Sequence, residues 1–302
     1  MLRKIDNFIS RITAEIEKSV RFISVFWKNN PIYFVCSLFY YIASSIMLGG
    51  TLKSFIIVFI FYRISLIIGF SSLGEKLLRL LNRVRPLETK REKEYLQPLF
   101  DEVLACAKAK NKRLRKIELC IVDDMTVNAM ALGRKTVAVT KGAMQTFSPE
   151  ELKAIMAHEV GHIAHGDTIA MLYTIIGNGI FSLLLLFVRV CLLLLDWIQS
   201  LFSGKHSIIS AVMFLLRLYL EICILIFNFG MQVIISVNSR KSEFSADMFS
   251  YSIGYDSDMI EALYLLEKIS LGDNSSIIQT MTASHPRLTL RIKNLEALDE
   301  LS

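Results

Sequence analysis

Four long apolar blocks divide the chain into alternating apolar and polar parts. They cover residues 31–50, 54–70, 168–195 and 208–237. A helix needs about 20 predominantly apolar residues to cross a bilayer, which is close to the length of the two shorter blocks. The short connection within each pair of blocks predicts a helical hairpin. We therefore expect about four transmembrane helices; the alternative, buried core helices of a large soluble domain, rarely run so long and so apolar.

The N-terminal segment has the pattern of an amphipathic helix. Basic residues lie on one helical face, and the other face carries Ile5, Phe8, Ile9, Ile12, Ile16 and Val20. This pattern is typical of a helix on a membrane surface, although a soluble helix packed on the polar domain has the same periodicity. No unbroken apolar core is followed by a small-residue cleavage site, so the pattern does not predict a signal peptide.

The polar sequence between the hairpins mixes helix and strand periodicity. The pattern predicts helices over about 91–110 and from 149, and strands at 116–122 and 136–140. Ser148 is suited to cap the second helix, because proline and two acids follow it. Beyond Asn238 the chain is polar again, with amphipathic patterns at 239–253, about 257–270 and about 287–300.

Composition agrees with a membrane protein. Hydrophobic residues make up 53% of the chain and the mean hydropathy is +0.46, with the excess concentrated in the four blocks. The formal net charge is +6, but the sequence lacks the basic stripe with interleaved aromatic residues that is typical of a nucleic-acid binder. The five cysteines are irregularly spaced, which favours a reducing compartment over a disulfide framework or a cysteine zinc site.

Lysine and arginine are unevenly distributed around the blocks. Residues 1–30, 74–116 and the segment from Arg240 are rich in them, whereas the two hairpin tips carry only Lys53 and Lys205. Cytoplasmic loops carry the excess of these residues in membrane proteins. Both termini and the whole polar domain are therefore expected in the cytoplasm.

Four charged residues lie inside the apolar blocks: Arg63, Arg189, Arg217 and Glu221. Such residues are costly in a membrane unless they reach the interface, line a polar interior or pair. Arg217 and Glu221 are four residues apart and are suited to pair along one helical face.

The segment HEVGHIAHGD (158–167) carries the chemistry. His158 and His162 are four residues apart, so a helix presents both imidazoles to one ion, and Glu159 is placed to polarise a metal-bound water. Accidental spacing is the alternative. The motif predicts one zinc ion per chain, and catalytic zinc normally takes a third protein ligand.

His165 is the candidate third ligand nearest in sequence, but its position is unsuitable. In a straight helix His165 would lie about 10 Å along the axis from His158, and Gly166 follows it too late to bend the chain between them. The segment 238–247 offers Glu243 and Asp247 on one helical face, at the end of the second hairpin. Glu243 can complete a two-histidine, one-glutamate site, and Asp247 can accept a ring N–H. A solvated acidic face is the alternative reading of this pair.

Four motifs together resemble the HtpX-type membrane metalloproteases, which are relatives of the CAAX prenyl proteases. They are HEVGH, SRKSEFSAD, NAMALG (128–133) and ASHPRLTLRI (283–292). The likeness covers nearly the whole chain, including four spans placed around the catalytic helix. It implies that Glu243 is the third zinc ligand and that Asp247 supports a histidine.

The resemblance also assigns roles outside the zinc ligands. Asn128 would hold the substrate backbone before an edge strand at 136–140, to which substrate adds as a further strand. His285 would donate to the oxyanion. Arg240 and Arg291 would brace the acids of the site; surface salt bridges are the alternative for both. Met130 stands where the family often has phenylalanine, a difference that affects a specificity pocket and not the chemistry.

The predicted architecture is a predominantly α membrane protein with a small α+β zincin-like cytoplasmic catalytic domain. Its expected parts are an N-terminal helix (1–30), a first hairpin (31–72), the first catalytic part (73–167), a second hairpin (168–237) and the second catalytic part (238–302).

The predicted function is zinc endopeptidase, with Glu159 as general base and then proton donor to the leaving amine. The resemblance implies stress-related quality control of damaged membrane proteins at the cytoplasmic face of a bacterial inner membrane. Expected partners are protein or peptide substrates and the bilayer, without nucleic acid; a homo-oligomer is left open. The alternatives are a narrow-specificity processing peptidase and a non-enzymatic metal-binding scaffold or transporter.

Overall fold

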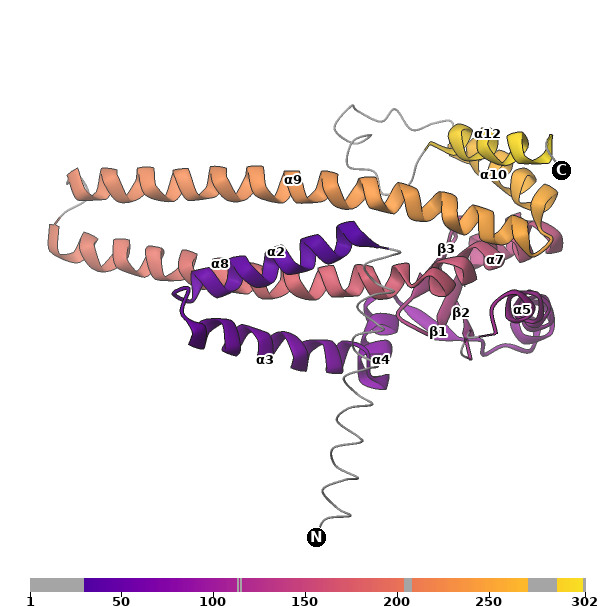
Figure 1. Cartoon of the computed structure of the whole chain (residues 1–302), viewed down its shortest axis with the longest axis horizontal. Helices are drawn as coiled ribbons and strands as arrows, with labels where there is room; N and C mark the ends of the chain where they lie inside the picture. The colour runs from indigo at the N-terminus through magenta and orange to yellow at the C-terminus, as the bar shows by residue number, and fades with distance from the viewer. Residues whose placement is uncertain (1–29, 113, 115, 204–207, 271–286, 301–302) are drawn as a thin grey trace, which may run out of the picture.

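The computed structural model describes residues 30–112, 114, 116–203, 208–270 and 287–300. The amphipathic segment expected at 1–30 lies outside them except for Asn30, and so does His285. Two helical hairpins project from one end of a domain that contains a small sheet (Figure 1). All statements below concern the described residues.

The hairpins are formed by four helices. The first contains α2 (Pro31–Met47) and α3 (Leu52–Gly69), and the second contains α8 (Asp167–Ser203) and α9 (Ile208–Ser252). By length and composition, α3, Asp167–Ile198 of α8 and Phe214–Ser252 of α9 are able to cross a membrane. α2 is apolar but has 17 residues, about 25 Å of helix. Three of the four expected spans therefore meet the criterion, and the fourth stays a prediction.

A two-glycine turn closes the first hairpin. Gly49 and Gly50 have positive φ angles of 106° and 63°, which glycine adopts without steric cost. Thr51 then starts α3 with a capping box in which its side chain and that of Ser54 satisfy each other's backbone N–H groups. The turn therefore ends one helix and starts the next within a few residues.

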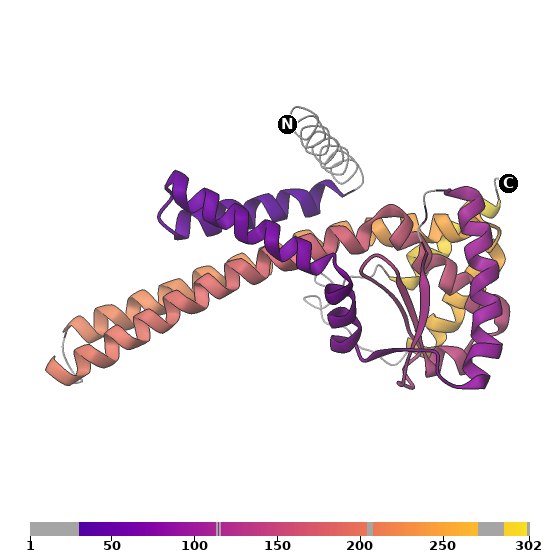
Figure 2. The same ribbon diagram turned by 90° about the horizontal axis from the view of Figure 1, so that it is seen from below.

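The first hairpin packs against the domain-proximal half of α8. The hydroxyl of Tyr62 donates to the carbonyl of Tyr173 at 2.8 Å, and the rings of Tyr40 and Phe181 lie 5.9 Å apart. With 37 and 45 residues, α8 and α9 are about 55 Å and 67 Å long, so the second hairpin extends far beyond the first (Figures 1 and 2).

Among the described residues, two ion pairs cross the second hairpin. Arg189 of α8 pairs with Glu221 of α9 at 2.5 Å, and Arg217 of α9 pairs with Asp196 of α8 at 2.7 Å. The prediction that Arg217 pairs with Glu221 along one helix is wrong. The antiparallel arrangement brings an opposite charge from the facing helix closer to each of them, and each charge is compensated between helices.

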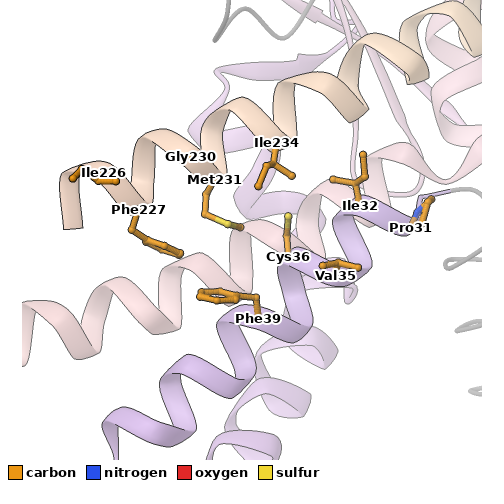
Figure 3. Close-up of a pocket in the computed structure, with 10 residues that line it drawn as sticks. All are labelled: Pro31, Ile32, Val35, Cys36, Phe39, Ile226, Phe227, Gly230, Met231 and Ile234. Atoms are coloured by element: carbon orange, nitrogen blue, oxygen red, sulfur yellow. The ribbon is translucent and has the colours of Figure 1, made fainter. Parts of the chain in front are cut away.

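An apolar groove lies between α2 and α9. It has a volume of about 490 Å³, and Figure 3 shows its walls: Pro31, Ile32, Val35, Cys36 and Phe39 on α2, and Ile226, Phe227, Gly230, Met231 and Ile234 on α9. Ile234 and Glu243 are nine positions apart, two and a half helical turns, so they lie on opposite faces of α9. The groove therefore opens away from the face of α9 that carries Glu243.

The sheet has four strands in the order β1-β2-β4-β3. They are β1 (Val84–Pro86), β2 (Glu118–Val122), β3 (Ala129–Leu132) and β4 (Thr136–Thr140). β4 pairs in parallel with β2 and antiparallel with β3, with Ala129 opposite Val139. The strand predicted as the edge, 136–140, is thus interior, and β3 within NAMALG forms the edge. The reason is a tight turn at Gly133 (φ 56°), which folds β3 back along β4.

Helices cover one face of the sheet and enclose the main core. They are α5 (Lys90–Lys110), α7 (Pro149–His165), α10 (Asp256–Ser270) and α12 (Leu288–Asp299). The short α6 (Lys141–Thr146) follows β4, and α4 (Ser72–Leu81) joins the first hairpin to β1. The core contains Leu96 and Leu152 as well as Met259 and Leu295, so segments on both sides of the second hairpin build one hydrophobic interior.

Candidate metal centre

The helix α7 carries the two predicted metal-binding histidines. Ser148 caps it through a capping box with Glu151, and Pro149 occupies its first turn. It ends at His165 because Gly166 adopts a left-handed conformation with a φ of 79°. His158 and Glu159 are buried in the middle of the helix, where α5, α9, α10 and β3 pack against it.

The last turns of α9 bring Glu243 to these histidines. Its Oε2 lies 3.4 Å from Nε2 of His158, and its Oε1 lies 3.5 Å from Nε2 of His162. One ligand atom from each of the three residues lies within 4.8 Å of the others. Two imidazoles and a carboxylate are a ligand set found in catalytic zinc sites.

Each imidazole contacts a further carboxylate through its Nδ1 atom, the ring nitrogen that points away from Glu243. Nδ1 of His158 lies 2.9 Å from Oδ1 of Asp247, and Nδ1 of His162 lies 3.0 Å from Oδ2 of Asp167. A ring whose Nδ1 donates to a carboxylate leaves Nε2 as its lone-pair nitrogen. Both Nε2 atoms then face Glu243, so the donor set is arranged to fit a divalent ion.

Asp167 was not among the residues expected at the site. It is the first residue of α8, and the left-handed turn at Gly166 places it beside the helix that has just ended. The available signal was its place five residues after His162, at the start of the second hairpin. Each histidine is thus oriented by a different helix of that hairpin.

Arg291 of α12 lies behind the carboxylates. Its Nε donates to Oδ2 of Asp247 at 2.8 Å, and its Nη1 lies 3.1 Å from Oε2 of Glu243. The side chain is only 6% exposed, so these contacts are made away from solvent. The structure therefore places Arg291 where a brace for the acids was expected; Arg240 is half-buried, and its role stays a prediction.

Competing effects act on the two histidines. Burial lowers the pKa of His162, but hydrogen bonds with Asp167 and Glu243 outweigh it and raise the pKa to about 10. For His158, burial again lowers the pKa, and contacts with Asp247 and Glu243 raise it more. The surrounding carboxylates therefore favour positive charge at this position, held either by protons or by a cation.

His165 and Asn128 lie apart from this cluster. The ring of His165 packs edge-on against Phe249, with 5.8 Å between ring centroids, and among the described residues the three-ligand cluster does not include it. Asn128 is exposed immediately before β3, and its Oδ1 accepts the backbone N–H of Ala129 at 2.9 Å. Since β3 packs against α7, Asn128 stands at the sheet edge nearest the histidine helix.

Comparisons with known proteins agree with this arrangement. The model of peptidase family M48 matches residues 90–299. A protease HtpX homolog of Bacillus pumilus is 28% identical over 219 residues, which cover 67% of this chain and 70% of the relative. Protease HtpX of Pasteurella multocida is 28% identical over 210 residues, 64% of this chain and 70% of that protein.

Among solved structures, the fold resembles the crystal structure of S. mikatae Ste24p. The TM-score is 0.51 at 18% identity, covering 94% of this chain and 66% of that chain. The apolar helices together with a clustered His-His-Glu set define a membrane metalloprotease. The family match spans more than half of the sequence, and the chain belongs to peptidase family M48. The resemblance to HtpX-type proteases is confirmed.

Proposed function

We propose that the protein is a zinc endopeptidase whose metal is held by His158, His162 and Glu243. The observation that carries the proposal is the convergence of three ligand atoms within 4.8 Å, with both outer imidazole nitrogens already bound by carboxylates. When bound, zinc would supply Lewis-acid polarisation and lower the pKa of a coordinated water. One ion per chain follows from the single cluster among the described residues.

Glu159 is the proposed general base. It neighbours His158 on α7 and is 9% exposed, so it is largely shielded from bulk water. Its carboxylate takes the proton of the attacking water and then gives it to the leaving amine. His285 is proposed, on the family resemblance, to donate to the oxyanion that forms on the scissile carbonyl.

Substrate is proposed to bind along β3. This strand ends the sheet and lies against α7, so a peptide added to it would run past the histidine helix. Backbone hydrogen bonds to an edge strand hold a peptide in extended form and tolerate many sequences. Asn128, at the start of the strand, is placed to hold the peptide backbone once its contact with Ala129 opens.

The proposed setting is the cytoplasmic face of a bacterial inner membrane. Support comes from the Lys- and Arg-rich segments next to the hairpins and from relatives named protease HtpX. The proposed role is quality control of damaged or misassembled membrane proteins. The proposed domain arrangement is one catalytic domain, built from residues 73–167 and 238–302, carried by two membrane hairpins.

The purified protein in detergent should cleave an unfolded casein-type substrate. Chelation should stop cleavage, and added zinc should restore it. A prenylated peptide is tested in parallel. If it is cleaved and casein is not, the protein is a processing peptidase of narrow specificity. If neither substrate is cleaved by zinc-loaded protein, the chain acts as a metal-binding scaffold and the proposal is wrong.

Changing Asp167 to asparagine should weaken zinc binding about 10- to 100-fold, as expected for loss of an outer carboxylate. The neutral amide keeps the shape of the side chain but no longer fixes His162 with its Nε2 free. Competition with a chromophoric chelator measures the affinity. Asp256→Asn is the matched control, because Asp256 also starts a helix, α10, outside the metal centre. Equal affinities in the two variants would refute the role of Asp167.

Changing His165 to alanine should leave one zinc ion bound per chain. His165 lies seven positions after His158, about 10 Å along α7, and packs against Phe249 instead. Metal analysis after gel filtration checks the prediction. A variant that folds but loses its zinc would make His165 a ligand and would displace Glu243 from that role.

A further inference from the structure

The helix α4 presents a row of leucines to its surroundings. Two residues separate it from the end of α3 at Gly69, and the second of them, Ser71, is its cap. Leu73, Leu77, Leu80 and Leu81 are 66%, 51%, 75% and 70% exposed. At about 100° per residue they fall within one face roughly 100° wide, the width of the apolar stripe of an amphipathic helix.

The opposite face of α4 is bound to the sheet. The carboxylate of Glu75 accepts the backbone N–H groups of Arg134 and Lys135 at 3.2 and 3.3 Å and the hydroxyl of Thr136 at 2.7 Å. Arg79 donates to Thr136 at 2.9 Å and pairs with Glu118 at 2.8 Å. These contacts fix the rotation of α4 and turn its leucines away from the sheet.

The contact with the turn between β3 and β4 is close. Gly133 has a φ of 56°, and a Cβ built on it would lie 2.3 Å from Oε2 of Glu75. Any other residue at this position would force the Glu75 carboxylate to move. The turn that ends the edge strand is thus held against α4.

The surroundings of the leucine face indicate a bilayer. Figures 1 and 2 show α4 running across the axis of α3, with the membrane hairpins on one side of it and the sheet on the other. Its exposed leucines follow directly on the exposed apolar side chains at the end of α3, which include Ile64, Ile67 and Ile68. Lys76 beside the leucines and Arg83 just after the helix are exposed, and basic residues in this position suit anionic headgroups.

We propose that α4 is an interfacial helix that docks the peptidase domain on the surface of an anionic bilayer. Its leucines enter the boundary between headgroups and acyl chains, and Glu75 transmits the position of the helix to the β3–β4 turn. The edge strand is then held at a set height above the membrane. The inference that docking positions β3 for substrate rests on the proposed function. The inference that α4 docks on the bilayer does not.

Photo-crosslinking in nanodiscs that contain phosphatidylglycerol tests the docking. Benzoylphenylalanine is placed at Leu77, at the lipid-facing Ile57 of α3 as positive reference, and at the exposed Lys108 of α5 as negative reference. Intact mass spectrometry should find phospholipid adducts at positions 57 and 77 and none at 108. Adduct formation at 77 no higher than at 108, or a protein–protein crosslink there, would overturn the proposal.

A double substitution, Leu77→Glu with Leu80→Glu, tests the consequence for catalysis. Cleavage of a membrane-tethered peptide in nanodiscs should fall at least about 10-fold, because charge on this face opposes insertion into the interface. Casein cleavage in detergent should stay within about two-fold of the parent protein, which shows that the variant is folded. Unchanged cleavage of the tethered peptide would overturn the coupling to β3. Failure of the parent to cleave casein would instead refute the proposed function. The docking of α4 would then be tested by the lipid adducts alone.

Discussion

Replacing Glu159 with glutamine should abolish proteolysis and leave zinc in place. The amide has nearly the same shape and stays beside His158 on α7, so the ligand geometry is preserved. It cannot accept a proton from the attacking water, and loss of a general base commonly costs 10²- to 10⁴-fold in rate. Cleavage of casein and metal content, measured on the same preparation, check both halves of the prediction.

The matched control for this variant is Glu94→Gln. Glu94 is an exposed carboxylate on α5 whose ion pair with Lys90 lies at the surface, so its loss should change neither property. Full cleavage by the Glu159 variant with zinc bound would show that another group accepts the proton. Loss of zinc from that variant would show instead that Glu159 is needed to bind the metal.

Replacing Glu243 with glutamine should remove both zinc and activity. The carboxylate lies between the Nε2 atoms of the two histidines, at 3.4 and 3.5 Å, and an amide oxygen is a much weaker ligand for zinc. The affinity should fall by more than the 10- to 100-fold typical of an outer carboxylate. Arg291 keeps its contacts with Asp247, so the buried arginine is still paired and the protein should fold.

Zinc titration of the folded variants Glu243→Gln and Asp167→Asn measures both affinities under the same conditions. It compares a carboxylate proposed to bind zinc with one that contacts a histidine. The predicted order of affinity is parent, then Asp167→Asn, then Glu243→Gln. A Glu243 variant that binds zinc as tightly as the parent would mean that the third ligand comes from elsewhere in the chain.

Much of this architecture was accessible from local patterns. The spacing of His158 and His162 and the capping residues before them predicted the helix that became α7. The pair Glu243 and Asp247 was expected on one helical face, and the structure places both next to His158. Such inferences succeed because residues four apart on a helix share a face whatever surrounds them.

Features that depend on pairing between distant segments were harder to predict. The pattern at 136–140 marks a strand, but whether that strand lies inside the sheet or at its edge depends on its partners. The same limit applies to Glu221, whose nearest charge is on the facing helix and not one turn away. Local patterns do not predict the role of Asp167, because that role depends on the direction of the chain after Gly166.

In the proposed site, two imidazoles and one carboxylate hold the zinc. X-ray absorption spectroscopy on zinc-loaded Glu159→Gln protein, which should not degrade itself, tests this ligand set most directly. We expect nitrogen and oxygen ligands at about 2.0–2.2 Å, with the multiple-scattering signature of two imidazoles. The additional substitution His165→Ala should leave the spectrum unchanged. A signature of three imidazoles, reduced to two when His165 is replaced, would contradict this ligand set.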